Sequence, residues 1–85
     1  MSKKLFVGSL PWAVNDEGLK EVFTPYGNVV SAIVVKDRRS GRSKGYGFVE
    51  MENDSEAKAA IDALNGSEIN GRNIVVNEAK PKERE

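Results

Sequence analysis

The sequence of 85 residues contains neither cysteine nor histidine. Without cysteine the chain can form no disulfide, no thiolate metal site and no thiol nucleophile, which agrees with a reducing compartment. Without histidine it also lacks the most common general base and zinc ligand of enzymes. We therefore expect neither an enzyme nor a metal site.

Long apolar runs are also missing. No apolar stretch approaches the length of a membrane span, and residues 1–4 lead directly into a predicted strand, so no signal peptide is visible. We expect no membrane association, and a cytoplasmic location, or a nuclear one in a eukaryote. The length suits one domain. We expect a monomer in which residues 1–80 form the domain and residues 81–85 a charged, flexible tail.

An excess of either charge is absent as well, because 13 Lys and Arg balance 13 Asp and Glu. Nucleic-acid-binding domains are usually basic, so this balance counts against such a function unless the charges are segregated. They are segregated: the charged residues within 36–44 are all basic except Asp37, and those within 50–68 are all acidic except Lys58. A solvated surface without a specific role explains the acidic segment. The basic segment directly precedes an aromatic strand, which favours a binding role.

That strand, residues 44–51, has an unusual distribution of side chains. Alternate side chains of a strand point to opposite faces. One face carries Lys44, Tyr46, Phe48 and Glu50, and the other carries Gly45, Gly47, Val49 and Met51. Rings beside a cation suit nucleic acids, because bases stack on rings and phosphate pairs with lysine. The alternative is that the rings are ordinary core residues of a strand buried on both faces.

Residues 4–8 repeat the same pattern, with Lys4 and Phe6 opposite Leu5 and Val7. Further strands are predicted at 29–36, with Ile33 and Val35 facing away from the helices, and at 74–77, with Val75 and Asn77 facing away. A polar loop at 37–43, predicted to be long and mobile, connects residues 29–36 to the aromatic strand. Asn70-Gly71 predicts a turn.

Two helices are predicted between these strands. The first begins at the N-cap Asn15 and ends near Gly27, which we expect in the left-handed conformation. The second is capped by Asn53 or Asp54 and ends at Asn65-Gly66. The apolar stripes are Leu19, Val22, Phe23 and Tyr26 in the first helix and Ala57, Ala60, Ile61 and Leu64 in the second. The alanines should let the second helix lie close to Gly45 and Gly47.

The order strand, helix, strand, strand, helix, strand predicts an α+β fold. It is the βαββαβ ferredoxin-like sandwich, a four-stranded antiparallel sheet with two helices on one face. The glycines at 41–47 match neither the Walker pattern nor the dinucleotide fingerprint, and a strand follows them where those motifs need a helix. We therefore expect no nucleotide cofactor.

Two of the strands resemble the signatures of the RNA-recognition motif family. Residues 44–51, KGYGFVEM, match the longer signature of that family at every position except Met51, where the family usually has an aromatic residue. Residues 5–10, LFVGSL, resemble the shorter signature, with Ser9 where the family often has Asn. The resemblance covers about residues 4–80. The chain is similar to small single-motif bacterial and glycine-rich RNA-binding proteins.

The resemblance implies a single-stranded RNA-binding module, with single-stranded DNA as an alternative partner. Bases would stack on Phe6, Tyr46 and Phe48, and Lys44 would pair with phosphate. Residues at the margins of the bound strand would be Lys4, Ile33, Val35, Asn77 and Lys80. Asn77, Glu78 and the backbone near Ala79 would read base edges, and the basic loop with Arg38, Arg39 and Arg42 would close over the RNA backbone. The rival functions are a protein-interaction module on the same fold and a small hydrolase, such as an acyl-phosphate hydrolase.

Overall fold

A computed structural model of the chain describes residues 3–11 and 13–79. Its elements are β1 (Lys3–Gly8), α1 (Asp16–Phe23), the 3₁₀ helix η1 (Thr24–Tyr26), β2 (Val29–Lys36), β3 (Ser43–Met51), α2 (Asp54–Leu64), β4 (Glu68–Ile69), β5 (Arg72–Asn73) and β6 (Val75–Glu78). The predicted order is confirmed, and the short β4–β5 hairpin is an addition to it.

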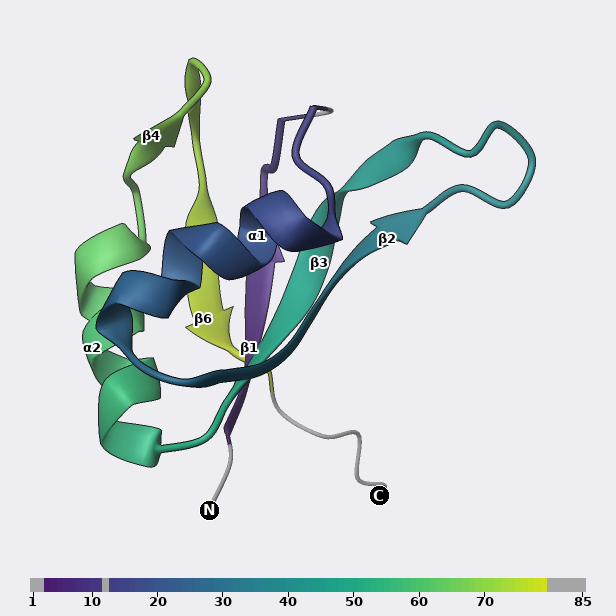
Figure 1. Ribbon diagram of the computed structural model, residues 1–85. Helices are drawn as coiled ribbons and strands as arrows, with labels where there is room; N and C mark the ends of the chain where they lie inside the picture. The colour runs from purple at the N-terminus through teal and green to yellow at the C-terminus, as the bar shows by residue number, and fades with distance from the viewer. Residues whose placement is uncertain (1–2, 12, 80–85) are drawn as a thin grey trace, which may run out of the picture.

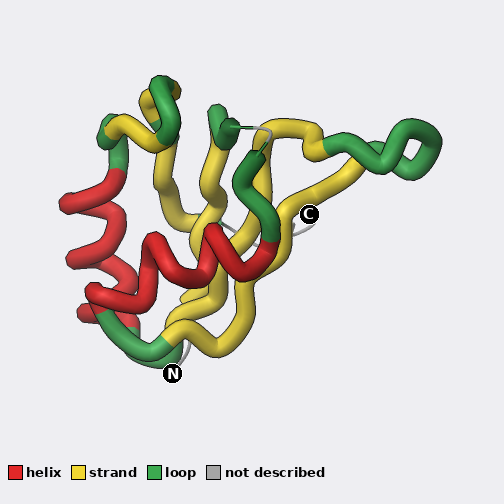
Figure 2. The backbone as a smooth tube through the Cα atoms, turned by 45° about the horizontal axis from the view of Figure 1, so that its top comes forward, coloured by secondary structure: helices red, strands yellow, loops and turns green. Residues whose placement is uncertain are grey.

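Four strands form one antiparallel sheet in the order β2-β3-β1-β6. Both helices lie on the same side of this sheet (Figure 1), and the view in Figure 2 shows the other side uncovered by helices. Helix α1 packs mainly on β2, whereas α2 packs on β6 and β1. The predicted α+β sandwich is confirmed, and it leaves one open face across β1 and β3, the two central strands.

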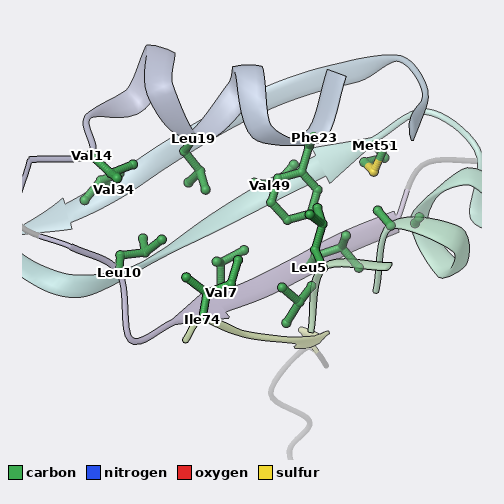
Figure 3. Close-up of a cluster of buried hydrophobic side chains, with 14 residues drawn as sticks. Leu5, Val7, Leu10, Val14, Leu19, Phe23, Val34, Val49, Met51 and Ile74 are labelled. Atoms are coloured by element: carbon green, nitrogen blue, oxygen red, sulfur yellow. The ribbon is translucent and has the colours of Figure 1, made fainter. Parts of the chain in front are cut away.

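The core lies between the sheet and the helices (Figure 3). The inward residues of β1, β3 and β6 include the fully buried Leu5, Val7, Val49, Met51 and Val76, and Ile74, just before β6, is fully buried too. The helices contribute Leu19, Phe23, Ala57, Ala60 and Leu64. Val22 and Ile61 are only partly buried against this core, because the predicted apolar stripes are wider than the contact that each helix makes with the sheet. Tyr26, also partly buried, lies in η1 and not in the first helix, which ends at Phe23.

Both outer strands of the sheet have a backbone N–H bonded by a side chain. In β2, the Val34 N–H donates to Asp16 Oδ1 at 2.8 Å, and in β6 the Val76 N–H donates to Asn65 Oδ1 at 3.0 Å. Asp16 opens α1 and Asn65 follows α2. Residues at the helix ends therefore satisfy backbone groups that a sheet edge leaves without a strand partner.

The predicted helix starts are confirmed in position, with different bonding at each. Asn15 Oδ1 accepts from the Gly18 N–H at 2.8 Å, the bond expected of an N-cap. The side chain of Asn53, the N-cap of α2, makes no capping hydrogen bond. Instead Glu56, in the first turn of α2, accepts from the Asn28 N–H at 3.1 Å and ties the helix to the segment before β2.

Two expectations about glycines are wrong. Gly27 has φ 156° and ψ −171°, which is not the left-handed helical conformation. A Cβ there would collide with the Glu56 side chain, so glycine makes room for that residue. Gly47 does not make room for α2, because a Cβ would meet the Ile33 carbonyl oxygen and lie 3.0 Å from Val34 Cα. The close neighbour of Gly47 is therefore the backbone of β2.

The predicted turn at Asn70-Gly71 is confirmed. Both residues have positive φ, 50° and 85°, as a two-residue hairpin turn requires, and they join β4 to β5. Within residues 3–11 and 13–79, no helix combines the length and apolar character needed to cross a membrane.

Candidate nucleic-acid interface

Three aromatic side chains meet on the open face of the sheet. Phe6 on β1 lies directly opposite Phe48 on β3, and Gly8 lies opposite Tyr46. The neighbouring residues Leu5 and Val49 are fully buried on the helix side. The rings therefore point away from the core, which excludes the alternative that they are core residues of a strand buried on both faces.

The three rings pack against one another. Their centroids are 5.8 Å apart for Phe6 and Tyr46, 5.9 Å for Phe6 and Phe48, and 6.4 Å for Tyr46 and Phe48. The first pair is tilted by 33° and the other two meet edge to face, at 66° and 87°. These are favourable aromatic geometries. The mutual packing explains why all three rings are half-buried on an otherwise open face.

One row of side chains crosses all four strands of the sheet. The strand register places Ile33 beside Phe48, Phe48 beside Phe6, and Phe6 beside Asn77. Ile33 is 52% exposed, and Asn77 is exposed too. The row therefore has an aliphatic end on β2, two rings in the centre and an amide on β6. Val35, further along β2, is half-buried.

Basic side chains lie at two places around the rings. Lys4 and Lys44 are exposed on β1 and β3. Lys4 is directly opposite Glu50 and lies on the face of the rings by the strand alternation. Between Lys44 and Tyr46 the alternation is interrupted, because Gly45 has φ 86° and the register between β2 and β3 shifts there. Arg38, Arg39 and Arg42 are exposed in the loop between β2 and β3, which projects beyond the rest of the domain (Figure 1).

That loop is a hydrogen-bonded turn built around Asp37. The Asp37 N–H donates to the Arg42 carbonyl at 2.7 Å, and the Asp37 carbonyl accepts from the Gly41 N–H at 2.8 Å. The Asp37 carboxylate accepts from the Arg39 N–H at 2.7 Å. The only acid of the basic segment thus serves the turn itself. The predicted position of the loop is confirmed, while its mobility stays a prediction.

Not all of the predicted site residues come together. Glu78 is opposite Leu5 in the register and pairs with Lys3 at 3.3 Å, so its side chain lies with the inward set and not beside Asn77. The alternation that sends Asn77 outward sends Glu78 inward. Lys80 lies outside the described residues, as does Trp12. Within the described part of the chain, no group of three or more acidic side chains could hold a metal ion.

Two residues of the open face were not predicted as part of the site. Val75 is 41% exposed on β6 and lies beside Gly8 in the register. The alternation places Val75 outward, but nothing in the sequence distinguishes it from an ordinary surface valine. Gly8 is buried on this outer face, under the ring of Phe6. Its role depends on the direction of that ring, which no sequence pattern gives.

Comparisons with known proteins agree with this geometry. The family model for the RNA recognition motif matches residues 5–75. Glycine-rich RNA-binding protein 2, mitochondrial, from Arabidopsis thaliana is 46% identical over 96% of this chain and 52% of its own length. The chain thus spans about half the length of the curated relatives it matches first. The mitochondrial relative also shows that proteins similar to this chain are not confined to the cytoplasm.

Solved structures are similar over almost the whole chain. The crystal structure of RNA Binding Protein PG1 superposes with a TM-score of 0.90, at 41% identity, over 96% of this chain and 99% of that one. A complex titled SXL-lethal protein/RNA gives a TM-score of 0.90 at 28% identity, over 98% of this chain and half of the other (50%). The predicted resemblance to glycine-rich RNA-binding proteins is confirmed, and the likeness to small bacterial proteins stays a prediction.

Proposed function

The chain belongs to the RNA recognition motif family, and we propose that it binds single-stranded RNA across the open face of its sheet. The observation that carries this proposal is the cluster of Phe6, Tyr46 and Phe48, three rings in mutual contact outside the core. A ring on a surface offers a stacking platform to any base, since every base has a flat π face. The action is binding, with no catalytic step.

The charges around the rings suit an RNA backbone. Lys4 and Lys44 are exposed on the two strands that carry the rings. Arg38, Arg39 and Arg42 are exposed in the loop between β2 and β3, which projects beyond the end of the sheet (Figure 1). In the proposed complex about two or three bases lie splayed on the sheet, as in other domains of this family. The backbone then runs past Lys44 towards the arginines of the loop. Single-stranded DNA offers the same bases and phosphates and is the natural competitor.

Base discrimination is proposed to come from the β6 end of the row. Asn77 lies beside Phe6, and its amide can both donate to and accept from a base edge. The nearby Ala79 N–H already donates to the Lys4 carbonyl at 2.9 Å, so it is not available to a base. At the other end, Ile33 offers apolar contact alone. We expect sequence preference for the base on Phe6 and little for the base on Phe48.

Single-stranded RNA should bind much more tightly than the same sequence in a duplex. Stacking on the rings needs exposed base faces, and a duplex hides them. Fluorescence-polarisation titrations would compare a single-stranded RNA pool of mixed sequence with perfectly paired duplexes, with single-stranded DNA as a third ligand. Equal affinity for paired and unpaired RNA would contradict the stacking platform, and no binding to either would favour the protein-interaction alternative.

Binding should depend weakly on salt, because the chain has no net charge and few cations near the rings. Contact with about two or three phosphates gives a slope of log affinity on log salt of about −1.5 to −2, at roughly −0.7 per phosphate for single strands. Replacing Arg38, Arg39 and Arg42 by Gln in one triple variant should make the slope shallower by about 1. This change corresponds to the loss of fewer than about two phosphate contacts.

The control for this experiment is Lys58→Gln, which removes a cation from α2 on the opposite side of the sheet and should leave the slope unchanged. A wild-type slope steeper than about −4 would require more phosphate contacts than the proposed path has. Equal slopes for the wild type and the triple variant would remove the loop from the site.

The remaining expectations belong to the same proposal. We infer a non-enzymatic domain that acts as a monomer, and a cytoplasmic location stays a prediction. A protein ligand on the same face is the main alternative. The three rings favour RNA over a protein ligand, since any of the four bases can stack on an exposed aromatic ring.

A further inference from the structure

We infer that Gly8 is a positioning residue for the Phe6 ring, an inference that rests on the RNA-binding function proposed above. A Cβ atom built on Gly8 would lie 2.9 Å from Phe6 Cε2 and 3.1 Å from Cζ. The shorter separation is essentially absent for real Cβ atoms, and the longer one is tighter than nine in ten of their contacts. The end of the ring therefore rests directly on the backbone of Gly8, in space that any other residue would fill.

The backbone of Gly8 gives no other reason for glycine. Gly8 is not among the residues with positive φ, so its conformation suits any amino acid. The three atoms nearest to the added Cβ all belong to the Phe6 ring. Gly47 differs, since its Cβ would meet the backbone of β2, which cannot move without disturbing the sheet. At Gly8 the only neighbour displaced is the far end of a side chain.

The position of that ring matters because it packs against both of the others. The Phe6 ring is 5.8 Å from Tyr46 and 5.9 Å from Phe48 between centroids, and Gly8 is the residue opposite Tyr46. A methyl group on Gly8 would lift the Phe6 ring from the sheet and change its tilt towards Tyr46. A base that stacks on Phe6 would then meet a ring in the wrong position, while the core under the sheet stays intact.

The experiment compares Gly8→Ala, Phe6→Ala and the double variant, with a short fluorescein-labelled single-stranded RNA pool of random sequence as the probe. Phe6→Ala should weaken binding by about fivefold to 100-fold, the loss of one stacked base. Gly8→Ala should weaken it by about fivefold or more, with an almost unchanged melting temperature. The double variant should bind no more weakly than Phe6→Ala alone, because Gly8 acts only through that ring.

A second measurement reads the ring directly and without RNA. In the wild type, NMR should show contacts between the Phe6 ring protons and the Gly8 α protons, and ring-current shifts of both. Gly8→Ala should shift the Phe6 ring resonances, while signals from the helix side, such as those of Leu19, stay in place. Unmoved Phe6 resonances in the variant would overturn the inference, whatever the binding data.

The matched control is Gly18→Ala, which adds the same atom on α1, away from the open face, and should leave RNA affinity unchanged. Wild-type affinity of Gly8→Ala, with Phe6→Ala weakened, would overturn the role of Gly8 and leave the proposed function standing. The inference would also be overturned if the double variant bound more weakly than Phe6→Ala by the same factor that Gly8→Ala causes alone. Gly8 would then act independently of the ring. If Phe6→Ala itself binds like the wild type, both the stacking platform and this inference fail.

Discussion

Replacing Phe23 with alanine is expected to lower the free energy of unfolding by about 3–5 kcal/mol, enough to leave much of the protein unfolded. Phe23 is fully buried and is the largest side chain among the fully buried residues. It points from α1 to the centre of the sheet, close to Val49 and Leu5 (Figure 3). The loss combines the transfer energy of the ring with the cavity it leaves, at a site where the sheet cannot collapse to fill the space.

Urea unfolding followed by circular dichroism would measure this effect, with Glu21→Ala as the control on an exposed position of the same helix. The control should change stability by less than about 0.5 kcal/mol. RNA binding of the Phe23 variant has to be compared at an equal folded fraction, where it should match the wild type. A cost below about 1 kcal/mol would mean that the core between helix and sheet is not packed as the structure has it.

Replacing Phe48 with alanine should weaken RNA binding even at an equal folded fraction, the opposite of Phe23→Ala. The binding free energy should weaken by about 1–3 kcal/mol per stacked base. Phe48 lies in the centre of the open face, between Ile33 and Phe6, where the bound strand has to cross. Titration of the variant with the single-stranded RNA pool would measure the loss. Phe48→Tyr keeps a ring of similar size and should recover most of the affinity.

The cost of Phe48→Ala in stability should be modest but measurable. From the sequence alone, an outward ring would be expected to contribute almost nothing to stability. The contacts with Phe6 and Tyr46 are each worth about 0.5–1.5 kcal/mol, so we expect a loss of about 1–3 kcal/mol for the two pairs together. If Phe48→Ala unfolds the domain as severely as Phe23→Ala, the rings are core residues and the proposed function loses its main support.

The division of the strands into two faces could be predicted because it depends on local alternation. Leu5, Val7, Val49 and Met51 are inward, and Phe6, Tyr46 and Phe48 are outward, as the period of two requires. The same reasoning gave the open face, and with it most of the candidate site. The helix starts were also predictable, because an N-cap is decided by residues within one turn.

Features that depend on contacts between distant segments could not be predicted. Gly27 is needed because a Cβ there would collide with the Glu56 side chain, and Gly47 because a Cβ would collide with the backbone of β2. Neither of these partners is close in sequence to its glycine. The resemblance placed Glu78 in the site, whereas the strand alternation turns it inward, and only the fold brings it to Lys3 at the other end of the chain. The partial burial of Ile61 likewise depends on how α2 sits on the sheet, which the helical period alone does not define.

The side-chain bonds to the outer strands have a consequence for behaviour at high protein concentration. Sheet edges with unpaired N–H groups can recruit a strand from another molecule and start growth into fibrils. Asp16 occupies such a group on Val34, and Asn65 occupies one on Val76. Intermolecular sheet growth is thus hindered at both edges by residues outside the open face. The rings can stay exposed for a ligand while one N–H on each edge strand is closed to an incoming strand.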